Sequence, residues 1–533
     1  MIDPIVRRPG SGGIRWSTGK ALALSTLTGL ATYSIGLLSN RDAAYKASNS
    51  SILRDRTVVP KYGAKAELDK ALPEIREFMG EDGITTDPEE LERHGFSSWS
   101  TYNIDTRPIA VAFPKTTEEV SKMAKICHKY HLPIIGYSGG TSLEGHFSAT
   151  EGGVCVDFVH MDKVLDIHVE DLDVVVQPSV GWQELNEVLK EKNLFFPPDP
   201  GPGAKIGGMV GTGCSGTNAS RYGTMRENVL NLTVVLADGT IIKTRQRPRK
   251  SSAGYDLTRL FIGSEGTLGL VTEATLKLTV LPEQTRVAIA PFESIRDAAS
   301  CVAKIMATGL QVGALELLDD VQMKVVNDAG DQARKYDEKP TLFLKFSGSP
   351  AGVKEQIEKV QTIAKETKAR SFDFARNDKE GADLWSARKE ALWSMIASQQ
   401  NENDGVWNTD MAVPLSKLPM IIEEAKAKMD KTGVLASIVA HAGDGNFHNI
   451  ILYNKNDPAE KAMVEQAVHE LVQRAIELDG TCTGEHGVGL VKKKYLVEEL
   501  GEDTLGLMKK IKMAIDPLDI MNPGKIFDFE VAK

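Results

Sequence analysis

The sequence predicts an α+β protein with two domains of different construction. Three glycine-rich loops lie among strand and helix patterns between residues 61 and 283. Beyond residue 283 these loops thin out, and strand patterns alternate with amphipathic helix patterns. The second region therefore predicts a separate antiparallel sheet with helices on one face.

Composition and charge exclude several classes of protein. The 533 residues are 41% hydrophobic and 26% charged, as in an ordinary globular chain. The net charge of −10 argues against a nucleic-acid binder, which usually has a basic face. The five cysteines are scattered and form no C-x-x-C pair, which excludes a disulfide scaffold, a cysteine zinc finger and an iron–sulfur site.

Residues 1–60 differ from the rest of the chain. They begin basic, rich in Ser and Thr and poor in acids, which is typical of a mitochondrial transit peptide. A charge-free run of 18 residues, Ala21 to Leu38, is close to the minimum of ~17–25 for a membrane-spanning helix. We therefore expect a targeting segment, an inner-membrane anchor at about residues 21–38, and a polar linker. A cleaved transit peptide without a span is the alternative.

The first domain should begin at residue 61 with regular elements around its loops. Periodicity predicts helices over 64–80 and 117–130, the second started by a Thr-Thr-Glu-Glu capping pattern. Strands are expected over 154–158, 173–179 and 270–278. Residues 231–244 read as a hairpin with Asp238-Gly239 at its turn.

The densest glycine stretch, Pro200 to Gly223, predicts a cofactor site. Its eight glycines would let backbone N–H groups approach a flat, anionic ligand. A flexible linker is the alternative, but Ile206, Met209 and Val210 are unlike linker residues. The loop from 136 to 146 carries hydroxyls and could bind phosphate oxygens, although a tight turn explains it equally well.

One motif inside this stretch is misleading. Gly211, Gly213 and Gly216 match G-x-G-x-x-G, the dinucleotide fingerprint. That motif is meaningful only after a strand and at the start of a helix, and neither flank fits. We therefore reject a Rossmann NAD site here.

The second domain contains two short motifs that suggest metal chemistry. His441 and His448 flank a glycine turn, and Glu485-His486 lies between glycines. Two imidazoles and a carboxylate form a common set for zinc, tolerant of manganese or iron. His469 lacks a second histidine at the spacing of a zinc protease and is expected on a solvated helix face. Arg388 could hold a carboxylate, although a surface arginine is the simpler interpretation. The other elements expected in this domain are strands over 286–291, 314–318, 341–346 and 434–440 and helices over 351–368 and 458–478.

Taken together, these motifs resemble the FAD-linked D-2-hydroxy-acid dehydrogenases of the vanillyl-alcohol-oxidase type. The resemblance covers roughly residues 65–530 and rests on the segments 136–146, 198–223, 254–257, 263–269, 441–448, 484–489 and 521–525. It implies a two-subdomain FAD-binding domain of the p-cresol-methylhydroxylase (PCMH) type over 61–283. An antiparallel-sheet cap domain over 284–500 would cover the flavin, and residues 501–533 would return to the FAD domain.

The resemblance also implies roles for individual residues. His441, His448 and Glu485 would bind a divalent metal, zinc or manganese, His486 would be the catalytic base, and Arg388 would hold the substrate carboxylate. The first loop departs from the family pattern, because Tyr137-Ser138 stands where glycine is common. The residues implied to bind FAD are Gly136, Gly139, Gly140, Thr141, Ser142, Gly145, His146, Pro200, Gly207, Gly208, Gly211, Gly213, Gly216, Thr217, Glu265, Gly266, Gly269, Val271 and Asn522.

The activity implied is oxidation of a small D-2-hydroxy acid, D-lactate, to pyruvate, with electrons passed to cytochrome c. The targeting segment suggests the inner membrane, facing the intermembrane space. A larger diacid, D-2-hydroxyglutarate, would need a second cation, and Asn408 is neutral where one would be sought. A quinone acceptor, a flavin-binding structural protein and a metal hydrolase remain as alternatives.

Overall fold

The computed structural model describes residues 60–97, 100, 102–329, 335–399 and 404–529. Residues 60–529 group into one unit of the chain. The predicted targeting segment and the membrane span at 21–38 lie outside the described residues. Within the described ranges, no helix combines the length and apolar character needed to cross a bilayer.

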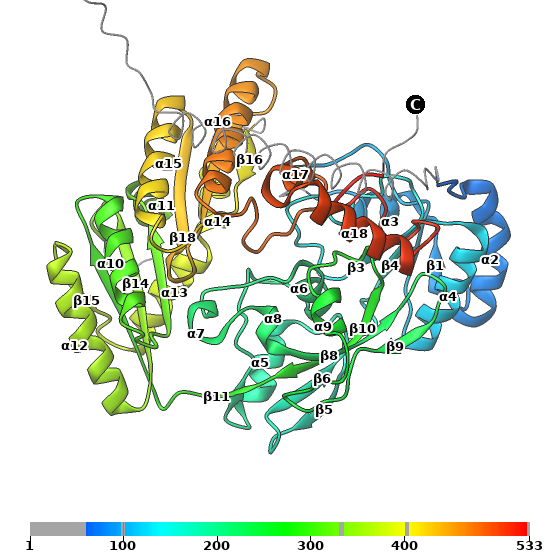
Figure 1. Ribbon diagram of the computed structural model, residues 1–533, viewed down its shortest axis with the longest axis horizontal. Helices are drawn as coiled ribbons and strands as arrows, with labels where there is room; N and C mark the ends of the chain where they lie inside the picture. Colours follow the sequence, from blue (N-terminus) through cyan, green and yellow to red (C-terminus); the bar gives the residue numbers. More distant parts are fainter. Residues whose placement is uncertain (1–59, 98–99, 101, 330–334, 400–403, 530–533) are drawn as a thin grey trace, which may run out of the picture. The chain divides into compact units, whose positions relative to one another are not determined.

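The first of three main sheets in the described chain lies near the start of the globular body (Figure 1). Its strand order is β1-β2-β4-β3, antiparallel between β1 and β2 and parallel elsewhere. The hydroxyl of Thr116 accepts a hydrogen bond from the Glu119 N–H at 3.1 Å, so the predicted capping pattern starts α4. The elements are α2 (Lys65–Met79), β1 (Ile84–Thr85), α3 (Pro88–Arg93), β2 (Ala110–Ala112), α4 (Thr117–Tyr130), β3 (Ile134–Tyr137) and β4 (Val154–Asp157).

The second sheet is antiparallel, in the order β5-β6-β10-β8-β9. The predicted hairpin is confirmed as the pair β8 and β9. The sheet strands are β5 (Val164–His168), β6 (Asp173–Val176), β8 (Val229–Val235), β9 (Ile241–Lys243) and β10 (Leu270–Lys277). A separate short pair joins β7 (Leu194–Phe195) to β11 (Thr279–Val280). The helices are α5 (Trp182–Lys190), α6 (Ile206–Thr212), α7 (Ala219–Tyr222), α8 (Met225–Asn228) and α9 (Leu257–Phe261).

The third sheet builds the cap and starts at residue 284, next to the domain boundary that we propose. Its described strands pair antiparallel in the order β15-β12-β14-β13-β18-β19-β16, and β17 also pairs with β19. They are β12 (Gln284–Pro291), β13 (Ala314–Leu318), β14 (Thr341–Gly348), β15 (Asp373–Phe374), β16 (Asp404–Asn408), β17 (Met411–Ala412), β18 (Leu435–His441) and β19 (Asn446–Asn454).

Helices cover both faces of this sheet, so the expectation of helices on one face is wrong. One face packs against α10 (Ile295–Ala307), α12 (Pro350–Glu366), α15 (Leu418–Thr432) and α16 (Pro458–Glu477). The other packs against α11 (Asp320–Ala329), α13 (Asp378–Lys389) and α14 (Ala391–Ala397). The physical reason is that the strands are apolar on both faces, as in β12, where Ala288 and Val287 are both buried but in different cores.

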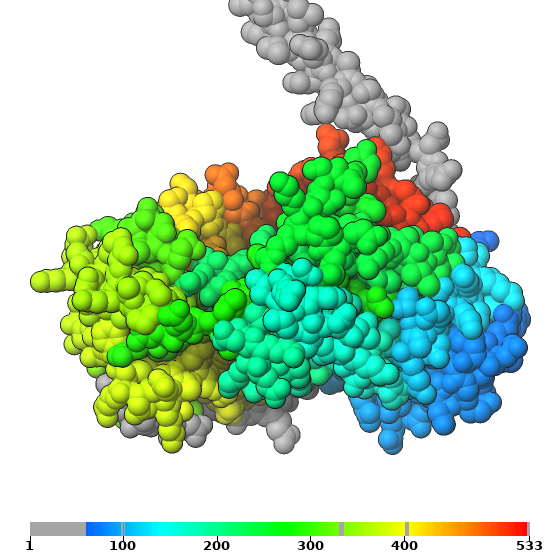
Figure 2. All heavy atoms as spheres, turned by 90° about the horizontal axis from the view of Figure 1, so that it is seen from below, coloured from blue at the N-terminus to red at the C-terminus, as the bar shows by residue number. Residues whose placement is uncertain are grey.

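After the cap, the chain returns to the first domain through α17 (Leu496–Leu500) and α18 (Glu502–Ile515). Met521 forms a β-bridge with Ile134, and the Asn522 N–H donates to the Ile134 carbonyl at 2.8 Å. In the space-filling view, the yellow-green cap residues lie beside the teal residues of the second sheet (Figure 2). Lys389 of α13 pairs with Asp199 at 2.9 Å, so the cap is in direct contact with the glycine-loop domain.

Candidate active site

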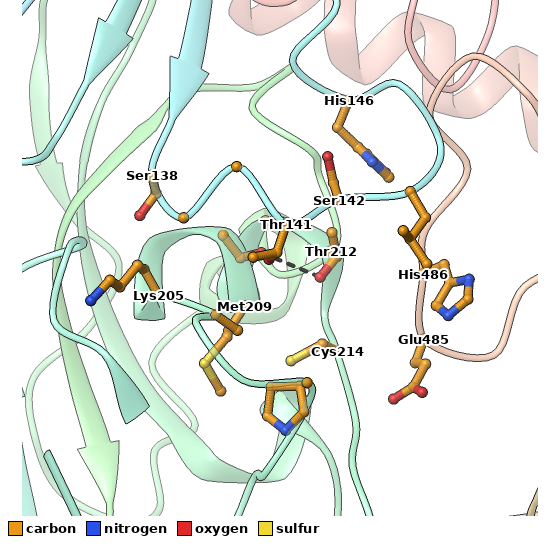
Figure 3. A pocket seen from close by; sticks show the side chains of 18 of the residues that line it. Ser138, Thr141, Ser142, His146, Lys205, Met209, Thr212, Cys214, Glu485 and His486 are labelled. Atoms are coloured by element: carbon orange, nitrogen blue, oxygen red, sulfur yellow. Dashed lines mark hydrogen bonds between the residues drawn. The ribbon is translucent and has the colours of Figure 1, made fainter. Parts of the chain in front are cut away.

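A cavity of about 340 Å³ lies between the glycine loops and the cap, within the range typical of cofactor and small-molecule sites. One wall comes from the three predicted loops, and the other comes from α13, α14, β18, β19 and the loop around Glu485. Figure 3 shows Ser142 and His146 of the first loop facing Glu485 and His486. All the predicted site residues line this cavity except Gly145 and Gly213, which turn the chain with φ of +74° and +68°.

The glycine stretch forms α6 where we expected loop, and its glycines have distinct tasks. A Cβ on Gly207 would meet Pro178 at 2.7 Å, so that glycine lets the helix approach its neighbour. A Cβ on Gly208 or Gly211 would meet nothing within 4 Å, and both positions line the cavity. Gly213 ends α6, so the G-x-G-x-x-G match does not start a helix, in agreement with our rejection of a Rossmann site. The open glycine face fits a flat cofactor.

Two of the predicted cofactor residues are engaged with the protein itself. The Glu265 carboxylate accepts hydrogen bonds from the backbone N–H groups of Val488 at 2.6 Å and Gly489 at 2.8 Å. The Asn522 amide donates to the carbonyls of His146 and Glu265 at 3.0 and 2.7 Å. These contacts tie the first loop, the third loop, the cap and the returning segment together at the cavity.

On the cap side, strand ends bring the predicted metal ligands together. His441 ends β18, and His448 lies in β19 opposite Val439, which is two residues before His441 and therefore on the same face of the sheet. The loop after residue 480 brings Glu485, whose carboxylate lies 3.1 Å from His441 Nε2 and 3.4 Å from His448 Nε2. Candidate ligand atoms of all three residues lie within 4.8 Å of one another.

Hydrogen bonds fix which imidazole nitrogen faces this point. His448 Nδ1 lies 2.9 Å from the Thr409 carbonyl, which can only accept, so Nδ1 carries the proton and Nε2 offers a lone pair. His441 Nδ1 lies 3.0 Å from the carboxylate of Glu316, another pure acceptor. A metal-binding imidazole usually donates its second N–H in this way. The donor set therefore fits a divalent cation such as zinc or manganese.

Electrostatics also favour a cation at this point. Burial raises the pKa of Asp444 to about 7, and the nearby Glu316 and Glu485 carboxylates add to the rise. Burial alone would lower the pKa of His441, yet Glu316 and Glu485 hold it well above its ordinary value. The shift of His441 reflects the negative charge of Glu316 and Glu485, which a bound cation would neutralise, whereas the shift of Asp444 is due mainly to burial.

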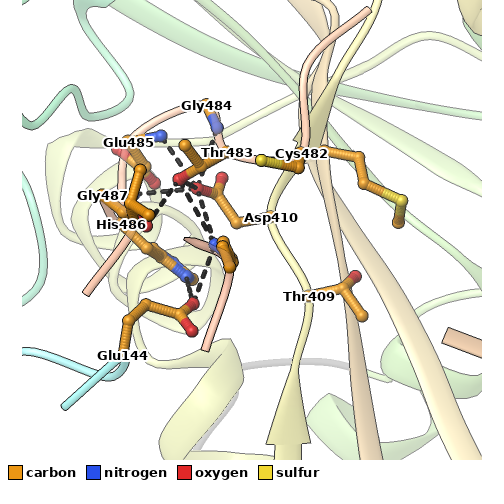
Figure 4. A network of polar contacts seen from close by, with 12 residues as sticks. Glu144, Thr409, Asp410, Cys482, Thr483, Gly484, Glu485, His486 and Gly487 are labelled. Atoms are coloured by element: carbon orange, nitrogen blue, oxygen red, sulfur yellow. Dashed lines mark hydrogen bonds and ion pairs between the residues drawn. The ribbon is translucent and has the colours of Figure 1, made fainter. Parts of the chain in front are cut away.

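A second group of possible ligands, Asp410, His448 and His486, is unsuited to a metal. The Asp410 Oδ2 atom accepts backbone N–H groups of Gly484, Glu485 and His486 at 2.8 to 2.9 Å (Figure 4). Its Oδ1 atom accepts the Asn446 amide at 2.8 Å. The task of this buried carboxylate is to shape the turn that presents Glu485 and His486.

Arg388 is buried rather than on the surface, which overturns the simpler interpretation of its role. It is 6% exposed, lies in the last turn of α13 and lines the cavity. Its guanidinium forms an ion pair with Glu316. Among the described residues, its Nε atom has no hydrogen-bond acceptor. A buried guanidinium with an unsatisfied donor beside a cavity fits a ligand carboxylate.

His486 lies between the two walls. Its ring stacks on His448 at 5.0 Å, and its Nδ1 atom lies 3.4 Å from the Glu144 carboxylate of the first loop. Burial acts to lower the pKa of His486, but Asp410 and Glu144 outweigh it and raise the pKa above its ordinary value. His469, by contrast, is half-buried on α16 and stacks on Tyr495, so it is not the solvated side chain that we expected.

Sequence reasoning missed Glu316, Asp410 and Glu144. Glu316 and Asp410 are single acidic residues outside the motifs, whereas Glu144 lies inside the predicted first loop, whose interpretation rested on its glycines and hydroxyls. In each case no neighbouring residue indicates which distant group the carboxylate would pair with. Lys492, which pairs with Glu144 at 2.8 Å, was missed for the same reason. Only the observation that a strand such as 314–318 carries one acid among apolar residues could have drawn attention to Glu316.

Comparison with known proteins agrees with this geometry. Residues 108–245 match the family model described as FAD binding domain, and residues 281–526 match FAD linked oxidases, C-terminal domain. The chain is 45% identical to the mitochondrial D-lactate dehydrogenase [cytochrome] of Kluyveromyces lactis, covering 94% of this chain and 88% of that protein. The Arabidopsis thaliana protein of the same name is 46% identical, covering 89% of this chain and 83% of that protein.

The chain belongs to the D-lactate dehydrogenase (cytochrome) family of FAD-linked oxidases. The family resemblance inferred from the motifs is thus confirmed. A probable D-lactate dehydrogenase of Danio rerio is 42% identical, covering 88% of this chain and 94% of that protein.

Solved structures confirm the fold predicted for this family member. 4-Ethylphenol oxidase from Gulosibacter chungangensis superposes with a TM-score of 0.71 at 20% identity, covering 89% of this chain and 99% of that one. p-Cresol methylhydroxylase superposes with a TM-score of 0.72 at 17% identity, covering 88% of this chain and 98% of that one. The chain therefore has a PCMH-type FAD-binding domain with an antiparallel-sheet cap. Because the sequence identity to these two structures is low, the similarity concerns the fold alone.

Proposed function

We propose that this chain is an FAD-dependent dehydrogenase that oxidises D-lactate to pyruvate and passes the electrons to cytochrome c. The observation that carries the proposal is that Arg388, the His441–His448–Glu485 set and His486 all face one cavity opposite the glycine loops. Relatives 42–46% identical to this chain bear the name D-lactate dehydrogenase.

The residues of the chain divide the work on the substrate. Arg388 binds the carboxylate, because it is a buried guanidinium with a free donor next to the cavity. His486 accepts the proton of the substrate hydroxyl, and the turn held by Asp410 keeps it beside Glu485. The raised pKa of His486 makes it a stronger base, and requires a pH above that pKa for it to be neutral.

Two bound groups complete this chemistry. The glycine-loop residues would hold FAD, which when bound would supply a hydride acceptor. His441, His448 and Glu485 would hold a divalent cation, zinc or manganese, which when bound would supply Lewis-acid chemistry at the substrate hydroxyl.

The charges around the cavity favour a small monocarboxylate over a diacid. The other cationic side chains among its described lining residues are engaged, Lys389 with Asp199 at 2.9 Å and Lys205 with Glu184 at 3.5 Å. Asn408 is neutral, and Leu392, Val439 and Ile450 add an apolar surface. D-2-hydroxyglutarate, whose second carboxylate would lie unpaired, is therefore the weaker candidate.

The experiment is anaerobic mixing of the purified flavoprotein with D-lactate, L-lactate and D-2-hydroxyglutarate in parallel. We expect D-lactate to bleach the flavin absorbance far faster than the other two. Faster bleaching by D-2-hydroxyglutarate would replace the substrate that we propose. A bound flavin that none of the three acids bleaches would favour the flavin-binding structural alternative. Comparing the rates at which cytochrome c and a soluble quinone reoxidise the reduced flavin decides the electron acceptor.

The cellular place of the reaction is part of the same proposal. Relatives are named mitochondrial, and residues 1–60 have the composition of a transit peptide. We place the enzyme at the inner membrane, anchored through residues 21–38 and facing the intermembrane space where cytochrome c resides. Carbonate extraction of mitochondria carrying the full chain, compared with a chain lacking residues 21–38, tests the anchor.

A further inference from the structure

We propose that Glu316 is a positioning residue that holds both halves of the substrate site at once. It orients His441 for the cation and Arg388 for the substrate carboxylate. The inference rests on the proposed function, because it concerns the two groups that would bind the hydroxyl and the carboxylate of one small acid.

The position of Glu316 makes a charged side chain costly unless it is paired. It lies in the middle of β13 and is 1% exposed. Its neighbours two residues away on the same face, Ala314 and Leu318, belong to an apolar core. An isolated carboxylate in such surroundings would be strongly destabilising, so its partners determine whether it is tolerated.

Its two partners come from different elements of the cap. The carboxylate oxygens lie 3.0 and 3.1 Å from His441 Nδ1, on β18. Arg388, on α13, forms an ion pair with the same carboxylate. Among the described residues, no carboxylate other than that of Glu316 lies within ion-pair distance of Arg388. One side chain thus joins the strand that carries a metal ligand to the helix that carries the arginine.

The contact with His441 selects the ring nitrogen that faces the cation. A carboxylate at Nδ1 keeps the proton there and directs the Nε2 atom toward Glu485, 3.1 Å away. Outer partners of this kind usually contribute ~10–100-fold to metal affinity. Replacing Glu316 by glutamine keeps the shape of the side chain but removes its charge. The new amide N–H group would also face a partner, His441 or Arg388, that is itself a hydrogen-bond donor.

The contact with Arg388 restrains a long side chain that has rotamer freedom of its own. With one edge of the guanidinium held by Glu316, the unsatisfied Nε donor remains available to a carboxylate in the cavity. Pre-organised positioning of this kind matters because small misplacements of a binding group cost about tenfold or more in rate or affinity.

The test compares Glu316→Gln with Asp319→Asn in the flavin-loaded protein. Asp319 is the matched control, because it is also a fully buried cap carboxylate but pairs with Lys426 instead of the site. Zn²⁺ affinity after chelator treatment, measured by equilibrium dialysis, reports the histidine half. The shift of the flavin absorbance on titration with propionate, which has the carboxylate of lactate but no hydroxyl, reports the arginine half.

We expect Glu316→Gln to weaken Zn²⁺ binding ~10–100-fold and propionate binding about tenfold, while Asp319→Asn changes neither. Loss of only one of the two affinities overturns the proposal, because Glu316 would then serve a single partner. Tighter propionate binding also overturns it, since Glu316 would be only a counter-ion that competes with the ligand.

A wild-type protein that binds neither Zn²⁺ nor propionate overturns the proposed function itself, whereas unchanged affinities in Glu316→Gln overturn this inference alone. If Glu316→Gln fails to retain flavin, Glu316→Asp takes its place. That variant keeps the charge but is one methylene shorter, so it cannot reach both partners, and we expect at least one of the two affinities to fall about tenfold. Two unchanged affinities in Glu316→Asp would contradict the proposal.

Discussion

The two walls of the cavity are built in opposite ways. The glycine-loop wall is made of backbone, and open positions such as Gly208 and Gly211 leave room for a flat ligand. The cap wall is made of side chains, with charges from β13, α13, β18, β19 and the loop after residue 480. The first wall is suited to holding a large cofactor by shape, and the second is suited to holding a small acid by charge.

This difference determines which substitutions each wall tolerates. A backbone wall tolerates side-chain loss but not side-chain gain, because any added atom occupies the space of the ligand. A side-chain wall tolerates little change at its few charged groups, because each removal leaves a buried partner unpaired. Substitutions in the two walls should therefore separate cofactor binding from chemistry.

The largest effect is expected from His486→Ala. The variant should keep its flavin, because the glycine loops are untouched. Its reduction by D-lactate should slow by at least ~100-fold, because the base that we propose is lost. Anaerobic stopped-flow absorbance measures the rate. His469→Ala, on α16 and outside the cavity, is the control and should reduce normally. Near-normal reduction of His486→Ala would exclude His486 as the base.

The next effect is expected from Asp410→Asn. The amide nitrogen would replace an oxygen that accepts three backbone N–H groups of the turn at 484–486. Because the turn presents Glu485, which we propose as a metal ligand, Zn²⁺ affinity should fall ~10–100-fold. Amide hydrogen exchange at 484–486 should speed up in the same variant. Asp320→Asn, at a half-buried position on α11 away from this turn, serves as control. Slow exchange in Asp410→Asn would disprove the role of this carboxylate.

A third, smaller effect is expected from Gly208→Ala in the backbone wall. The added methyl group meets no protein atom within 4 Å, so the fold should be unaffected, but it enters the cofactor space. An overpacking cost of about 1–3 kcal/mol corresponds to roughly tenfold weaker FAD binding. Flavin content after gel filtration and the unfolding temperature of the apoprotein are the measurements. Gly381→Ala, where the methyl meets ordinary contacts at 3.6–3.7 Å, should keep its flavin.

The smallest effect, with no change in turnover, is expected from Asp319→Asn. Burial raises the pKa of Asp319 from 3.8 to about 7. Between these two pH values the folded chain keeps a proton that the unfolded chain loses. The contribution of Asp319 to the free energy of unfolding is therefore fully present below pH ~4 and is lost as the pH rises through about 7. The free energy of unfolding falls by at most ~1.4 kcal/mol per pH unit in this range. The variant should lack that slope. Urea midpoints of both proteins between pH 4.5 and 7.5 measure it, and parallel curves would refute the shift.

Local motifs could be predicted from the sequence, whereas contacts across the chain could not. The glycine loops, the histidine pair and Glu485-His486 each lie within a few residues of one another, so their chemistry is visible in one stretch. Glu316 meets His441 across 125 positions, and Asp410 meets Glu485 across 75. No periodicity or spacing encodes such pairs, because the sheet and the loop bring them together only in the folded chain.

The same limit explains the errors in the fold. Residues 206–212 form a helix despite three glycines, because packing against neighbours such as Pro178 outweighs their poor helix propensity. The second helix layer of the cap was missed because a strand that is apolar on both faces gives no alternation to read. The predicted strand at 434–440, by contrast, differs from β18 by one residue at each end.

The returning segment, in which Met521 pairs with Ile134 and Asn522 holds two loop carbonyls, has a consequence for biosynthesis. Residues that follow the whole cap in the chain complete the first domain. A nascent polypeptide still on the ribosome therefore lacks part of the wall beside its first glycine loop until the cap has been translated. We therefore expect stable flavin loading to follow translation of both domains, and we expect a prematurely terminated chain not to retain flavin.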